Sequence, residues 1–240
     1  MATEPGTLQF ANLTFRGLQR ETLLRDDGRL KAIITVNAEI IVEANRNPKL
    51  AAIINNNWAT LDGQWPYLLA RRRSRVRPIE KISGSDFVYE LCEFAGKHGH
   101  RVCLLGAATE VNRTACVRLR REFGIEIDGY SPPNRPFPFA KAEDEEILAR
   151  LQTFKPQILV VCFGSPKQEL WADLHNETLD RMGVRWVIGA GGTLDFIAGA
   201  VKRAPVLLQK AGLESVWRLA LEPRSRIRRV LRAFQFVRYI

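Results

Sequence analysis

The chain has 240 residues, 46% of them apolar, and a net charge of +10. This length and apolar content allow a substantial core, which excludes the disordered and fibrous classes and favours one domain or two closely packed lobes. The four cysteines form no C-x-x-C pair, so we expect reduced core thiols in a cytosolic protein. The N-terminus lacks the pattern of a signal peptide, and no window approaches about 18 uninterrupted apolar residues, so neither export nor a membrane span is expected.

Apolar runs and helical patterns alternate along the chain. The expected strands, bounded by Gly, Asn or Pro, span residues 32–36, 58–61, 102–105, 125–127, 158–163 and 184–188. The expected helices span 39–56 with a break near Pro48, then 86–97, 110–123, 143–154 and 167–182. This alternation predicts a Rossmann-like α/β fold with a largely parallel sheet and flanking helices. The proline-rich stretch 131–139 is expected to be an extended connection.

The alternating pattern changes after Ile188, and we divide the chain into an α/β core at 1–205 and a helical appendage at 206–240. The segment 201–240 carries a net charge of +8, and it contains helical patterns on both sides of Pro223. Arginines surround an apolar stripe in the last helix, made of Ile227, Val230, Leu231, Phe234, Val237 and Ile240. Such a basic amphipathic helix either packs on the core or lies on an anionic membrane. A second basic run lies at 71–77.

The stretch V-V-C-F-G-S-P-K-Q-E-L-W, residues 160–171, raises the question of why a buried strand ends in polar residues. One interpretation is a helix start, with proline at the first helical position and Glu169 in the first turn. The other directs Lys167 and Gln168 at a ligand, because ligands of open α/β sheets bind beyond the carboxyl ends of strands. The local pattern favours the first interpretation.

Asp62 follows another expected strand, so we place it on the same rim as Thr35 and Asn37. An Asp-Gly pair alone is usually a turn, and the shared rim is what favours a function. Asp86 and Asp195 are interpreted first as cap or loop residues and second as ligand contacts.

Cofactor and metal motifs are weak. Gly189 and Gly191 resemble the start of a dinucleotide fingerprint, but Leu194 stands at the third glycine position, and the chain has no Walker Gly-Lys-Ser/Thr. The glycines can instead allow a diphosphate to approach the backbone closely. The histidines lack metal-ligand spacing and no Asp-x-Asp pair is present, so we expect no metal and no cofactor. Arginines or lysines would then have to neutralise a nucleotide leaving group.

Seven blocks stand in a recognisable order along the chain. They are T-V-N-A-E at 35–39, D-G at 62–63, G-S-D at 84–86, F-G-S-P-K-Q-E-L-W at 163–171, G-A-G-G-T-L-D-F-I-A-G at 189–199, K-R-A-P at 202–205 and G-L-E-S-V-W-R-L-A-L-E-P-R at 212–224. Over about residues 31–232 the chain resembles the WecG/TagA/CpsF glycosyltransferase family. Two departures from that family are Gln64 and Trp65 after the Asp-Gly pair, and Lys81 where an arginine is common.

The resemblance implies an inverting, metal-independent transfer from a UDP-sugar to a polyprenyl-diphosphate-linked saccharide, in the synthesis of a cell-surface polysaccharide or exopolysaccharide. The sugar would be of the N-acetylmannosamine type, its uronic acid, or of the glucose type. The enzyme would be cytoplasmic and peripheral on the inner membrane, with the appendage on the anionic lipid and no nucleic-acid partner. The resemblance leaves homo-oligomerisation open. The alternative is a basic α/β protein that binds nucleic acid through its tail, with no need for Asp62.

The resemblance also implies roles for individual residues. Asp62 matches the general base, and Thr35 with Asn37 matches the motif beside it. The donor-binding residues it implies are Lys81, Lys167, Gln168, Gly189, Gly191, Asp195, Arg203, Arg218, Arg224 and Arg228.

Overall fold

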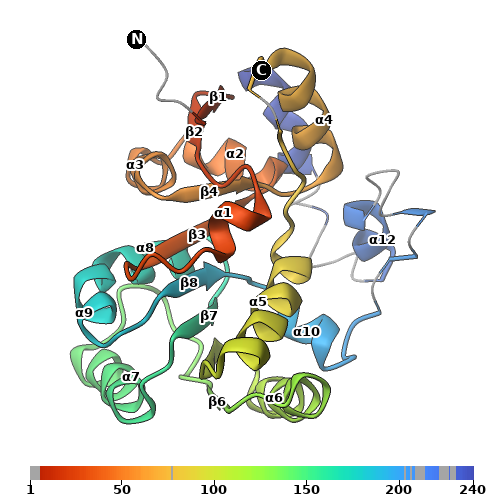
Figure 1. Cartoon of the computed structure of the whole chain (residues 1–240). Coiled ribbons are helices and arrows are strands. Elements are labelled where there is room, and N and C mark those ends of the chain that lie inside the picture. The colour runs from red at the N-terminus through yellow and green to blue at the C-terminus, as the bar shows by residue number, and fades with distance from the viewer. Residues whose placement is uncertain are drawn as a thin grey trace. The chain divides into compact units, whose positions relative to one another are not determined.

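The computed structural model describes residues 6–76, 78–202, 204–205, 207–208, 214–221, 227 and 231–240, and the side chains at 214, 215, 218 and 221 lie outside this description. The chain forms two compact units (Figure 1). Unit 1 comprises Met1–Leu23, Ile34–Ser83 and Lys202–Ile240, and unit 2 comprises Leu24–Ile33 and Gly84–Val201. The division predicted at residue 205 stays a prediction, because much of the appendage lies outside the described residues.

The main sheet has six parallel strands flanked by helices, which confirms the predicted fold class. Its order is β4-β3-β8-β7-β5-β6. The strands are β3 (Lys31–Val36), β4 (Trp58–Leu61), β5 (Val102–Gly106), β6 (Ile127–Tyr130), β7 (Ile158–Cys162) and β8 (Trp186–Gly189). Five of the six expected strands coincide with these to within two residues at each end.

Helices cover both faces of the sheet in unit 2. They are α5 (Gly84–His98), α6 (Thr109–Phe123), α7 (Lys141–Phe154), α8 (Lys167–Leu174), α9 (Asn176–Arg181) and α10 (Thr193–Ile197). Figure 1 shows α7, α8 and α9 on one side of these strands and α5, α6 and α10 on the other. Leu159 and Val161, two apart on β7, pack in one core with Trp171 of α8 and Leu179 of α9. Because both faces are covered, every residue of β5 and β7 is buried.

Unit 1 contains a short antiparallel hairpin in addition to its part of the sheet. The hairpin pairs β1 (Leu8–Phe10) with β2 (Leu13–Phe15). The other elements described in this unit are α1 (Arg20–Leu24), α2 (Ala38–Ala44), α3 (Pro48–Asn56), α4 (Gln64–Arg73), α12 (Glu214–Leu221) and a 3-10 helix, η1 (Gln235–Tyr239). Pro48 begins α3 behind the N-cap Asn47, which confirms the predicted break.

Three local predictions need correction. The strand expected at 125–127 starts later, because left-handed Gly124 ends α6 and the chain needs two more residues to reach the sheet. The helix expected at 167–182 is two helices divided at His175, whose Nε2 lies 2.8 Å from Asp144 Oδ2. The last helix ends as the 3-10 helix η1 rather than in α-helical form.

Candidate functional site

The carboxyl ends of β3 and β4 hold three of the predicted residues in unit 1. The backbone N–H of Asp62 donates to the carbonyl of Val36 at 3.0 Å, which places Asp62 beside Thr35 and Asn37. Thr35 is 7% exposed and Asp62 is half-buried. Gly63 follows with φ +89°, a conformation that favours glycine and turns the chain into α4 directly after the aspartate.

Asn37 has a structural task at this rim. Its Oδ1 accepts a hydrogen bond from the N–H of Ile40 at 3.0 Å, so it is the N-cap of α2. The cap fixes where β3 ends and α2 begins, and thereby positions the backbone beside Asp62. A direct part for Asn37 in the chemistry stays a prediction.

Lys81 lies on a segment beside β4. The N–H of Ile82 donates to Leu61 O at 3.0 Å, and Thr60 Oγ1 donates to Ile82 O at 3.0 Å. Arg20 anchors the same segment, since its Nη2 donates to Lys81 O at 2.8 Å. Unit 1 therefore brings Lys81 next to the strand that ends at Asp62, although the two residues are far apart in sequence.

In unit 2, Gln168 connects two loops. Its Oε1 accepts from the N–H of Gly164 and from the N–H of Gly191, each at 3.1 Å, and its Nε2 donates to Glu169 Oε1 at 2.8 Å. Gln168 is 3% exposed. The amide thus holds the loops after β7 and β8 together, and we call this arrangement the Gln168 brace. Its place in the structure supports a positioning role, and contact with a ligand stays a prediction.

The two glycines after β8 differ in their surroundings. A Cβ at Gly189 would lie 2.7 Å from Gln168 Nε2, whereas a Cβ at Gly191 would come no closer than 3.7 Å, to Gln168 Oε1. Gly189 is therefore required by the Gln168 brace. Gly191 has room for a methyl group, so packing within the chain does not explain its glycine.

Burial raises the pKa of the Glu169 carboxyl, and the hydrogen bond from Gln168 offsets part of this effect. Glu169 is 4% exposed, which explains why its charged form is disfavoured. The carboxyl belongs to the interior of the Gln168 brace.

Lys167 points at the proline-rich segment 131–139. Its Nζ donates to Asn134 Oδ1 at 3.2 Å and to Arg135 O at 2.9 Å, and lies 5.6 Å from the ring centroid of Phe139. Partial desolvation lowers the pKa of this ammonium. Lys167 thus connects the loop to the start of α8. Contact of Lys167 with a ligand stays a prediction.

The sheet topology reveals a position that the sequence did not indicate. The chain leaves β5 toward β6 but leaves β7 toward β8, in the opposite direction, and β5 and β7 are neighbours. Ligands of open α/β sheets commonly bind beyond the strand ends at such a reversal. Gly106 stands there with φ +106°, and a Cβ on it would lie 2.8 Å from Cys162 O. Ser131 Oγ donates to Gly106 O at 3.1 Å. A lone glycine after a strand was the only signal in the sequence.

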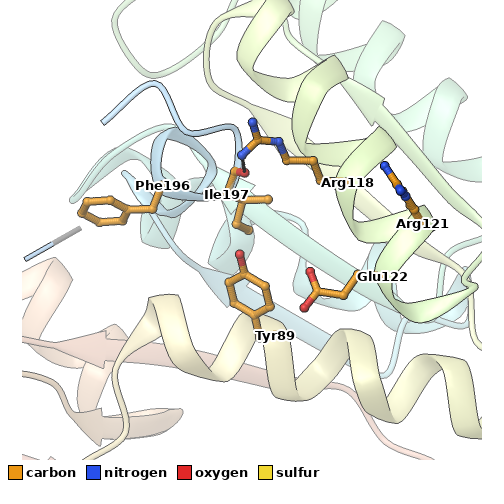
Figure 2. Close-up of a pocket in the computed structure, with 6 residues that line it drawn as sticks. All are labelled: Tyr89, Arg118, Arg121, Glu122, Phe196 and Ile197. Carbon is orange, nitrogen blue, oxygen red and sulfur yellow. Dashed lines mark hydrogen bonds between the residues drawn. The ribbon is translucent and has the colours of Figure 1, made fainter. Parts of the chain in front are cut away.

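A separate open pocket of about 410 Å³ lies among α5, α6 and α10. Figure 2 shows the Tyr89 hydroxyl and Arg118 directed into it, with Phe196 turned away. Arg118 Nη1 donates to Ile197 O at 2.9 Å, so this guanidinium holds α10 against α6. No predicted site residue lines this pocket.

Five predicted donor-binding residues need a separate account. Arg203, Arg224 and Arg228, with the side chain of Arg218, lie outside the described residues. Asp195 is half-buried in the first turn of α10.

The C-terminal segment 231–240 docks on α2 within unit 1. Arg232 Nη1 lies 3.1 Å from Glu43 Oε2, and Arg46 Nη2 donates to Gln235 Oε1 at 2.6 Å. Phe236 is buried, whereas three residues of the predicted stripe, Leu231, Phe234 and Val237, are 61%, 67% and 60% exposed. The stripe is therefore accessible on the described part of the segment.

A family comparison decides the class of protein. The model of the glycosyl transferase WecG/TagA/CpsF family matches residues 5–240. The chain belongs to this family. Membership confirms the resemblance seen in the sequence blocks, and it makes the chain a glycosyltransferase.

Two further observations concern the described part of this WecG/TagA/CpsF chain. Its helices there include none long and apolar enough to cross a bilayer. No cluster of three or more His, Cys, Asp or Glu side chains suited to a metal ion occurs among the same residues. Metal independence remains a prediction for experiment.

Proposed function

We propose that this glycosyltransferase moves a sugar from a UDP donor to a polyprenyl-diphosphate-linked saccharide with inversion of configuration. The observation that carries the proposal is the position of Asp62 at the joint end of β3 and β4, beside the Thr35–Asn37 motif. A half-buried carboxylate that follows a strand is accessible to a substrate and held by a rigid element.

Asp62 acts as the general base in this proposal. The acceptor hydroxyl oxygen attacks the anomeric carbon, its proton passes to the Asp62 carboxylate, and the bond from the anomeric carbon to the diphosphate breaks with its electron pair leaving on UDP. Lys81 and the C-terminal arginines stabilise the charge that develops on the diphosphate. The Gln168 brace positions the loops after β7 and β8 within unit 2.

The donor sugar is of the N-acetylmannosamine type, its uronic acid, or of the glucose type, and the product enters a cell-surface polysaccharide or exopolysaccharide. The test is a thermal-shift panel of UDP-sugars, followed by transfer to a lipid-linked acceptor in excess chelator. One UDP-sugar should raise the melting temperature above the effect of UDP and should be consumed. Loss of transfer in chelator, with recovery on magnesium or manganese, would contradict the proposed role of the cationic residues.

The appendage at 206–240 associates with the cytoplasmic face of an anionic membrane. The exposed apolar stripe at Leu231, Phe234 and Val237, together with the +8 charge of 201–240, supports this. Deleting the residues after Glu222 should abolish binding to anionic vesicles and strongly reduce transfer. If the truncated protein transfers sugar as fast as the full chain, the appendage has only a packing role.

A further inference from the structure

Helix α4 presents an apolar and basic face to solvent directly after Asp62 and Gly63. Trp65 is 54% exposed and Leu68 is 41% exposed, while Pro66 and Ala70 on the opposite side are buried. At about 100° per residue, Trp65, Leu68 and Arg72 fall on one side of the helix. A tryptophan and a leucine this accessible, one turn apart, are not explained by the packing of unit 1.

The charge of this segment has one sign. Residues 64–78 contain five arginines and no acidic residue, a formal charge of +5. The arginines at 71, 72, 73 and 75 are exposed. Glu80, which follows the segment, is engaged with Arg20 at 2.6 Å. The α4 face therefore combines exposed apolar side chains with a segment of positive formal charge.

We propose that the α4 face, defined by Trp65, Leu68 and Arg72, lies on an anionic phospholipid bilayer. Tryptophan favours the boundary between headgroups and acyl chains, and arginines attract anionic headgroups. A nucleic-acid partner would use the arginines but would leave Trp65 and Leu68 unexplained, so the bilayer accounts for more of the surface. This surface is made of other residues than the C-terminal stripe.

The contact has a consequence for the site. Trp65 is three residues from Asp62, and Gly63 is the only residue between Asp62 and the first residue of α4. A membrane contact of α4 brings the carboxyl end of β4 close to the lipid surface, where the diphosphate of a lipid-linked acceptor lies. In this respect the inference rests on the proposed function, but the contact itself can be measured without sugar transfer.

The decisive experiment places an environment-sensitive fluorophore on the α4 face of the full-length protein. The four native thiols are buried, and burial raises the pKa of Cys92 to about 12 and of Cys116 to about 11, so an introduced exposed cysteine is labelled selectively. Leu68→Cys is the probe. Leu174→Cys is the matched control, because Leu174 is also an exposed leucine, at 59%, but lies on α8 in unit 2.

Vesicles of phosphatidylcholine with about one third phosphatidylglycerol should shift the emission of the label at position 68 to the blue, and should leave the label at 174 unchanged. Pure phosphatidylcholine should shift neither label, and salt should reverse the shift. A label at 68 that stays in water while the protein sediments with the anionic vesicles would overturn the proposal.

A charge variant tests the arginines. R71Q/R72Q/R73Q in the full chain should weaken binding to the same anionic vesicles by roughly tenfold or more. Vesicle affinity equal to that of the unmodified protein would contradict the proposal. A variant that loses affinity for duplex DNA but keeps its affinity for the vesicles would contradict it as well. Neither measurement reads sugar transfer, so the proposed function and the α4 contact can fail independently.

Discussion

The two strand-end clusters of this glycosyltransferase hold residues from equally polar sequence blocks, yet the side chains differ in burial and in their hydrogen bonds. In unit 1, Asp62 is half-buried at the end of β4 with Thr35 beside it. In unit 2, Gln168 is 3% exposed, and its Oε1 accepts from Gly164 and Gly191. A polar residue that follows a buried strand can therefore remain partly accessible in one place and be held in the interior in the other.

The difference can be measured because the two roles affect different quantities. Removing a general base lowers turnover and leaves folding intact, whereas removing a buried hydrogen-bond partner lowers the free energy of unfolding. A variant of Asp62 should therefore change turnover. Variants of Gln168, Gly189 and Glu169 should instead change the free energy of unfolding.

The largest effect is expected at Asp62. Asp62→Asn should lower turnover by roughly 100-fold or more, because the amide cannot take the acceptor proton. Affinity for UDP, measured by calorimetry, should be nearly unchanged, and so should the melting temperature. Wild-type turnover in this variant would remove Asp62 from the mechanism.

The second effect is expected at Gln168 and concerns folding. Gln168→Ala leaves the N–H groups of Gly164 and Gly191 without their acceptor, and each such group costs about 1–3 kcal/mol. The melting temperature should fall by about 5–10 °C. Lys167→Ala is the matched control, since its ammonium contacts a partly exposed loop and its loss should change the melting temperature little. Equal melting temperatures for Gln168→Ala and the unmodified protein would show that the brace contributes nothing to folding.

The glycine pair after β8 sharpens the comparison inside unit 2. Gly189→Ala should lower the melting temperature by several degrees, about the effect of 1–3 kcal/mol of overpacking, because its methyl group meets the Gln168 amide at 2.7 Å. Gly191→Ala should fold normally, because its nearest neighbour would be 3.7 Å away. If Gly191 allows a diphosphate to approach, the alanine variant will instead lose affinity for UDP. Normal UDP affinity in Gly191→Ala would remove that role.

The smallest effect is expected at Glu169 and depends on pH. Burial raises the pKa of this carboxyl above its ordinary value of 4.5, so the stability it contributes is present below that value and is lost as pH rises through the folded pKa. Glu169→Gln keeps an oxygen to accept from Gln168 Nε2 and removes the ionisation. It should raise the melting temperature by about 2–4 °C at about pH 8 and by less near pH 4. A gain independent of pH would show that the pKa of the carboxyl is the same in the folded and the unfolded chain, so that burial does not raise it.

Much of the fold could be read from the sequence because it rests on local patterns. Trp58–Leu61 was predicted to the residue, and the break at Pro48 follows from proline at the first helical position. Helix α4 was missed, because Pro66 and three consecutive arginines hide its weak apolar periodicity. Helix α10 was missed because five residues are too few for a period to show.

The sequence by itself determined the fold class, the family and the rim on which Asp62, Thr35 and Asn37 meet, since parallel strands end at one edge and each strand is a local pattern. Only the tertiary structure decided which way Gln168 points. Its amide is held by Gly164, four residues away, and by Gly191, 23 residues away, and the second contact exists only because β8 lies beside β7. The same holds for the place of Gly106 at the reversal between β5 and β7, which depends on the order of strands in the sheet. Local sequence patterns contain no information about which distant loops become neighbours.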